Sequence, residues 1–370
     1  MDVFVHLNVK RRFDPYRRTF RNENEIMENP DEDSTRARGQ IFKYVALQMG
    51  HQPRLFVFAV GISGPFARFY RFDHSSVCVS ASFNYHEDPK TLTEFFLRYS
   101  TLTPEERGFD PTVSVTTEAE KSLFFSRIQD YLRRAKAKNW RQYPGIEETG
   151  KEGFPILKIR VNSVDSGSRW YLACKPGSLP LSPAFIGKFT RGFIALPIDS
   201  GGAHSEPLNE LSSAANESGK LYWLKDTWRP ANRELEFSIY NYLKKRDVAN
   251  LPEIVCCGDV TENGAIQETE NHSFLADSGA DWRRPTGIIR HMIHHRSVQE
   301  LLIPLWHVKT ARELLRAGRD ALLSTKSNLT SVIVSDFRFS HCRRISSRMS
   351  PTSGHQHRQH HANERSKQWN

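Results

Sequence analysis

The chain has 370 residues, of which 38% are hydrophobic and 25% are charged, and its formal net charge is +10. This length suggests two or three domains of roughly 100–200 residues each. No apolar run approaches the ~18 residues that a membrane-spanning helix needs, and the start lacks the pattern of a secretory signal. The five cysteines have neither C-x-x-C spacing nor the density of a disulfide scaffold. We therefore expect an intracellular protein of the cytoplasm or nucleus.

The first part of the chain, residues 1–145, predicts a domain that mixes helices and strands. Apolar residues recur at helical spacing over residues 39–49. Three β-rich runs follow at residues 55–60, 66–72 and 77–83, and glycine and proline separate the first two. This pattern is typical of an antiparallel meander.

Capping residues predict the starts of two later helices in this part. Asp88 followed by Pro89 combines an N-cap acid with proline at the first helical position. Thr117 and Glu120 have the spacing of a capping box, and the apolar stripe after them predicts a longer amphipathic helix. The polar, glycine-containing stretch at residues 136–153 indicates a domain boundary.

The second part, residues 150–325, begins with strands and ends with a helix. A stretch rich in Gly, Ser and Asn at residues 200–220 indicates a surface insertion. The patterns predict an α+β arrangement, with strands at 156–161, 170–174, 193–196 and 221–224, a helix at 232–246, strands at 254–260 and 288–293, and a helix at 310–323.

The last part, residues 326–370, is rich in Ser, Arg and His, and we predict a disordered tail. Residues 341–370 hold six Lys or Arg against one Glu, which gives 6 − 1 = +5, half of the net charge. A basic tail can bind nucleic acid, and it can equally be an incidental charged segment.

The first candidate site is a turn between two predicted strands, from Gly187 to Gly192, followed by Phe193 and Ile194. A loop that covers ATP phosphates follows G-x-G-x-x-G-x-V, because glycines let the backbone approach the phosphates. Here Phe189 replaces the middle glycine. The turn is therefore either a phosphate loop or an ordinary β-turn.

Lys225 and Glu236 extend this pattern in the order that a nucleotide site requires. Lys225 ends an apolar run, where its ammonium group could neutralise phosphates. Glu236 lies on the predicted helix that follows, where its carboxylate could hold the lysine in place. Two alternatives remain open, since Asp226 could pair with Lys225 and Glu234 could replace Glu236.

Several other strings carry a family resemblance. They lie at residues 52–58 (QPRLFVF), 68–73 (RFYRFD), 106–112 (ERGFDPT), 186–192 (IGKFTRG) and 224–229 (LKDTWR). In these strings the chain resembles the fungal-type protein kinase family of mushroom-forming fungi, over roughly residues 3–323. His74 stands where an Arg is usual.

The resemblance implies a fold and an activity. The fold would be a family-specific N-terminal α+β domain, then a protein-kinase-like small lobe with an incomplete large lobe. The activity would be ATP-dependent phosphoryl transfer to protein Ser or Thr, with ATP and Mg as cofactors. Gly187, Gly192, Lys225 and Glu236 would hold the nucleotide.

The resemblance ends before the catalytic loop of that family. His-Arg-Asp loops supply the base and a magnesium ligand, and this sequence contains no His-Arg-Asp. We therefore expect no catalytic residues, little or no phosphoryl transfer and a doubtful role for Mg.

Other readings stay open beside this one. The alternatives are a nucleotide-binding or partner-binding pseudokinase and a nucleic-acid binder acting through the basic tail. The protein substrate is unknown, and we expect no membrane partner. Asp2, Lys10 and the histidines do not show the ordered spacing of a metal site, so no metal ligands are predicted.

Overall fold

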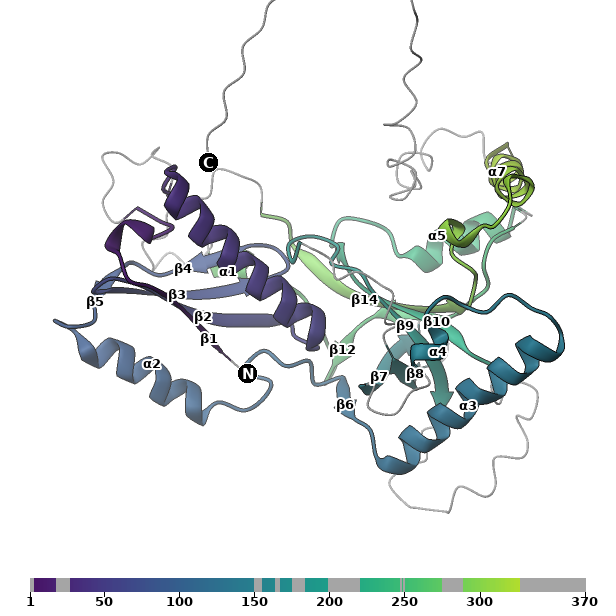
Figure 1. Cartoon of the computed structure of the whole chain (residues 1–370), viewed down its shortest axis with the longest axis horizontal. Helices are drawn as coiled ribbons and strands as arrows, with labels where there is room; N and C mark the ends of the chain where they lie inside the picture. The colour runs from purple at the N-terminus through teal and green to yellow at the C-terminus, as the bar shows by residue number, and fades with distance from the viewer. Residues whose placement is uncertain are drawn as a thin grey trace, which may run out of the picture.

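The computed structural model describes residues 3–17, 27–149, 155–163, 167–174, 184–198, 220–246, 248, 250–274 and 289–326. Two large β-sheets lie next to each other in the chain fold, and each has its own helices (Figure 1). The fold is therefore mixed α+β, as the sequence predicts. Residues 327–370, which hold most of the predicted tail, lie outside the described residues.

The first sheet contains the three β-rich runs of the N-terminal part. Its strands are β1 (Phe4–Asn8), β2 (Phe56–Ser63), β3 (Phe66–Asp73), β4 (Val77–Val79) and β5 (Phe83–Asn84). The predicted antiparallel meander is confirmed, because β2 pairs with β3 and β3 pairs with β4 in antiparallel register. The N-terminal strand β1 adds to the edge of β2 in parallel, which the sequence pattern did not indicate.

Two helices cover the opposite faces of the first sheet (Figure 1). Helix α1 (Glu32–His51) buries Ile41, Val45 and Met49 against one face, and a short 3-10 helix, η1 (Arg11–Phe13), lies near its start. Helix α2 (Pro89–Thr101) stacks its aromatic side chains on the other face. The predicted start of α2 is confirmed, since the Asp88 side chain accepts a hydrogen bond from the backbone N–H of Thr91.

The second sheet has seven strands in the order β11-β14-β10-β9-β8-β7-β6. Neighbouring strands are antiparallel throughout. Their bounds are β6 (Val113–Val115), β7 (Ile156–Ser163), β8 (Gly167–Cys174), β9 (Arg191–Ile198), β10 (Tyr222–Pro230), β11 (Ile254–Asp259) and β14 (Met292–Glu300). A small hairpin of β12 (Thr261–Glu262) and β13 (Ala265–Ile266) follows β11.

The second sheet curls until its two sides meet. The side-chain amide of Asn162 in β7 donates to Thr261 Oγ1 just after β11, at 2.8 Å. Arg160 in β7 likewise donates to the carbonyl oxygen of Thr261 at 2.7 Å. An apolar core that includes Val161, Leu224 and Val298 fills the inside of the curl.

Helix α3 (Glu118–Ala137) and the one-turn helix α4 (Ile146–Thr149) cover the outside of β7, β8 and β9. The capping box predicted for α3 is present at Thr117 and Glu120. The sequence divides the chain at residues 145–150, and this domain division stays a prediction. The packing groups residues 113–149 with the second sheet, because β6 pairs with β7 and the apolar stripe of α3 packs on that sheet.

The remaining helices follow the strands of the second sheet. They are α5 (Glu236–Lys244), α6 (Asn271–Phe274), the 3-10 helix η2 (Leu305–His307) and α7 (Ala311–Lys326). Within the described residues, no helix combines the length and the hydrophobicity that crossing a membrane requires.

Candidate functional site

Lys225 and Glu236 form an ion pair at the surface of the second sheet. Lys225 Nζ donates to both carboxylate oxygens of Glu236, at 3.0 Å each. Lys225 lies in the middle of β10, and Glu236 is the first residue of α5. The side chains keep 30% and 27% of their exposure. The pair therefore presents a held ammonium group that a ligand from solvent can reach.

The two alternatives to this pair are resolved by position. Glu234 lies before the first turn of α5 and is exposed. Asp226 is adjacent to Lys225 in the strand, so its side chain points to the opposite face of the sheet. There Asp226 accepts a hydrogen bond from Arg191 Nε at 3.1 Å.

Gly192 lies directly opposite Lys225 in the antiparallel pair of β9 and β10. A side chain is excluded at this position, because a Cβ on Gly192 would lie 1.9 Å from Cζ2 of Trp223. The structure thus brings together three of the four residues predicted to hold the nucleotide: Gly192, Lys225 and Glu236.

Gly187, the fourth of these residues, is bound to the first sheet. It belongs to residues 184–190, called here the glycine segment. The N–H of Gly187 donates to the carbonyl oxygen of His74 at 2.8 Å, and its φ of +95° favours glycine. His74 Nδ1 in turn donates to the carbonyl oxygen of Phe185 at 2.6 Å. Phe189 buries its ring beside His74, with the ring centroids 4.8 Å apart.

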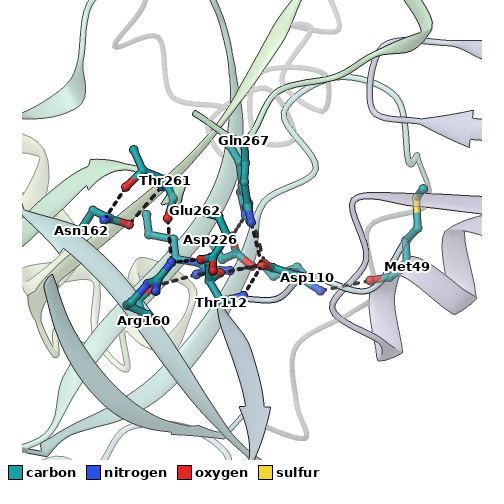
Figure 2. A network of polar contacts seen from close by, with 12 residues as sticks. Met49, Asp110, Thr112, Arg160, Asn162, Asp226, Thr261, Glu262 and Gln267 are labelled. Atoms are coloured by element: carbon teal, nitrogen blue, oxygen red, sulfur yellow. Dashed lines mark hydrogen bonds and ion pairs between the residues drawn. The ribbon is translucent and has the colours of Figure 1, made fainter. Parts of the chain in front are cut away.

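A buried polar network ties the second sheet to the end of α1 (Figure 2). Its members share nearly complete burial and come from segments far apart in the sequence: Asp110, Thr112, Arg191, Asp226, Gln267, His294 and Arg296. Arg191 also donates to the carbonyl oxygens of Met49 and Gln52 at the end of α1, at 3.3 and 3.1 Å. The end of α1, the start of β9 and the centre of β10 are therefore tied together.

The two aspartates of the network are held in their charged form. Burial by itself would raise the pKa of Asp110, but Arg296, His294 and hydrogen bonds from Thr112 and Gln267 outweigh it and lower the pKa to about 2. Burial likewise opposes the charge on Asp226, and Arg191, His294 and Arg296 hold its pKa well below the usual range. Arg296 Nη2 donates to Asp110 Oδ2 at 2.5 Å.

The other strings that carry the family resemblance also make long-range contacts. Arg68 Nε donates to Asp14 at 2.9 Å, and both side chains are buried. Asp73 accepts hydrogen bonds from the backbone N–H groups of Glu270 and Asn271, at 3.1 and 2.8 Å. Arg68 anchors the segment after η1 on β3, and Asp73 anchors the start of α6 at the end of β3.

The histidines near β14 have protein partners. His294 contacts Asp226 and Gln267, and its ring stacks on Trp228 with centroids 4.7 Å apart. His295 Nδ1 lies 2.9 Å from Asp259. Among the described residues, no group of three or more His, Cys, Asp or Glu side chains is placed to hold a metal ion. Asp2 lies outside the described residues.

Residues 6–141 match the family model described as fungal protein kinase. Searches of curated proteins and of solved structures found no match. The matched segment contains the first sheet, α1, α2, β6 and α3.

Residues 6–141 are similar to the fungal protein kinase family, and the resemblance predicted from the sequence is confirmed over this segment. The family as a whole implies ATP and Mg. The matched segment ends before Gly187, so the match does not include the four residues predicted to hold the nucleotide, and their roles stay a prediction.

Proposed function

We propose that this chain binds the phosphate groups of ATP at Lys225. The observation that carries the proposal is the ion pair of Lys225 with Glu236 beside Gly192. A lysine on a small-lobe strand, held by a helix glutamate, is the device by which protein kinases neutralise nucleotide phosphates. The match of residues 6–141 to the fungal protein kinase family supports ATP as the class of ligand, and it ends before Lys225.

The glycine segment enters this proposal in a limited way. The space over Gly192 is taken by the ring of Trp223, and the N–H of Gly187 is already used by His74. We therefore assign phosphate contact to Lys225 first. Glu236 positions the lysine, and Gly187 shapes the turn.

We further propose that the chain transfers phosphoryl groups slowly or not at all. Its sequence contains no His-Arg-Asp triplet, which would supply the base for the substrate hydroxyl and precede a magnesium ligand. On this proposal the protein is a pseudokinase that holds nucleotide, and Mg contributes little to the affinity.

The test is ATP binding by calorimetry, with matched lysine variants. Lys225→Ala should weaken binding roughly tenfold or more, because a charge-assisted contact worth about 1.5–3 kcal/mol is lost. Glu236→Gln should weaken it less. Lys244→Ala, an exposed lysine on the same helix, is the control and should bind like the wild type. Equal affinity of Lys225→Ala and the wild type would rule out the proposed site.

Transfer of radiolabelled phosphate to a general protein substrate tests the second point. We expect no signal above background from the wild type. Turnover that Lys225→Ala abolishes would show an active kinase instead.

The natural partner stays open. Nucleic-acid binding by the basic tail remains a prediction, since residues 327–370 lie outside the described part of the chain. Its mark would be an affinity that falls steeply with salt and disappears when residues 341–370 are deleted.

A further inference from the structure

One face of the second sheet carries Lys225, and aromatic side chains already cover the part of this face next to it. Trp223 and Lys225 are two residues apart in β10, so they share a face. Their partners in β9 are Ile194 and Gly192, whose positions lie on the same face. We call this set of four the Lys225 face.

The cover consists of Trp223, Tyr143 and helix α3. The ring of Trp223 lies over Gly192, where it fills the position of a Cβ. Tyr143 packs on Trp223 with ring centroids 5.4 Å apart and planes inclined by 31°. Ile194 is fully buried, in one cluster with Phe124 of α3. Lys225 itself remains 30% exposed.

This arrangement leaves Lys225 open to the phosphates of a nucleotide, and it covers the apolar surface on which the base would stack. A base gains affinity by stacking on apolar or aromatic surface in a concave site. With the phosphates at Lys225, the apolar neighbours on this face among the described residues of β9 and β10 are Ile194 and Trp223. Ile194 is closed off by α3, and the face of Trp223 is used by Tyr143.

We infer that Trp223 and Tyr143 occupy the place of the base, so that the site binds an oligophosphate chain without recognising the base attached to it. The inference rests on the proposed function, because it takes Lys225 as the phosphate contact. The ligand class is the triphosphate group, carried by any nucleotide or free in solution.

The decisive measurement compares ligands that share a phosphate chain. ATP, GTP, CTP and inorganic triphosphate are titrated into the wild type in buffer with EDTA, so that metal binding does not differ between them. We expect dissociation constants within about threefold of one another, since a tenfold ratio corresponds to ~1.4 kcal/mol of base contact. Adenosine should not compete. ATP binding more than about tenfold tighter than both CTP and triphosphate would overturn the inference.

Variants of Trp223 test whether this side chain excludes the base. Trp223→Ala should strengthen ATP binding about tenfold, because an opened aromatic site can stack a purine, and should leave triphosphate binding unchanged. Trp223→Leu serves if the alanine variant does not fold. Trp306→Ala, an exposed tryptophan in η2, is the matched control and should change nothing. Unchanged ATP affinity in folded Trp223 variants would also overturn the inference.

Failure of the proposed function would look different. In that case neither ATP nor triphosphate binds, or both bind equally well to Lys225→Ala, and both proposals fall. If Lys225→Ala weakens both ligands while the wild type favours ATP over triphosphate, the phosphate site stands and only the exclusion of the base is wrong.

Discussion

His74 shows how one residue can join two parts of the molecule. It is 1% exposed, and its ring lies between Phe189 and Trp228, with centroid distances of 4.8 and 4.5 Å. Burial disfavours its charged form and lowers its pKa from 6.5 to about 4. The neutral ring is therefore part of the packing between β3 and the glycine segment.

This lowered pKa predicts a loss of stability in mild acid. Between pH 6.5 and 4 the unfolded chain binds a proton on His74 that the folded chain does not, so stability is full above pH 6.5 and falls as the pH drops toward 4. From pH 7 to 5 the wild type should lose about 2 kcal/mol more than His74→Gln does. Urea unfolding at both pH values measures this, and His86→Gln, an exposed histidine, is the control. Equal losses in wild type and His74→Gln would contradict the prediction.

For single residues, the sequence predicts the contacts of the site that lie close together along the chain, and it misses the partners that come from distant segments. Strand alternation places Lys225 and Asp226 on opposite faces of the sheet. Glu236 lies on the helix that follows this strand, where it can reach Lys225. The partners of Asp226 could not be predicted in this way. Arg296 and Asp110 are 186 residues apart, and no local pattern links such pairs.

Among the elements, the glycine segment departs most from its sequence pattern. The pattern allows a loop over phosphates or an ordinary β-turn, and the aromatic residues of the segment are buried in the core of the first sheet. Phe185 meets Phe42 and Phe72 edge-on, with ring centroids 5.4 Å apart in both pairs. Phe189 adopts a φ of +31°, which a bulky residue rarely takes.

Truncation of Phe185 should therefore loosen this anchor. Phe185→Ala should cost about 3 kcal/mol of unfolding free energy, as for a buried aromatic residue. Exchange of the Gly187 and Trp228 amides, which bond to His74 and Lys188, should quicken. Phe96→Ala removes a ring that is 38% exposed and should cost less. Equal costs for the two variants would mean that the segment is not anchored by Phe185.

Capping residues predict where helices begin, but they do not predict which strands pair in a sheet. The starts of α2 and α3 agree with Asp88 and Thr117 because a cap is a contact within four residues. The parallel partner of β1 lies some fifty residues away in β2. Helix α3 likewise packs on strands that come later in the chain. Its apolar stripe alone could therefore not predict on which sheet it packs.

Considered as a whole, the molecule has buried charges where the second sheet meets the end of α1. Arg296 and Asp110 are both without exposure at their side chains. Removal of one member of a buried ion pair leaves the other uncompensated. Because Arg191 of the network bonds to the end of α1, which packs on the first sheet, we expect the network to couple the stability of the two sheets.

Asp110→Asn tests this dependence. It should cost roughly 3–5 kcal/mol, and hydrogen exchange should separate into two stages, one for α1 with β2 and β3 and another for β10 with β14. The wild type should show the same protection in both groups. Asp130→Asn alters an ion pair on the surface of α3 and should cost less than about 1 kcal/mol. A single stage in Asp110→Asn would show that packing alone couples the sheets.

The placement of α3 affects folding of the chain during its synthesis on the ribosome. Phe124 and Ile128 bury their side chains against Ile194 and Leu221, which are made later. At about 5–20 residues per second, the ribosome takes roughly 5–20 s to reach Leu221 after Ile128. During that interval all strands of the first sheet have been synthesised. The apolar stripe of α3 stays exposed, because its partners have not yet been made. We expect chaperones that bind nascent chains to meet this protein first at α3.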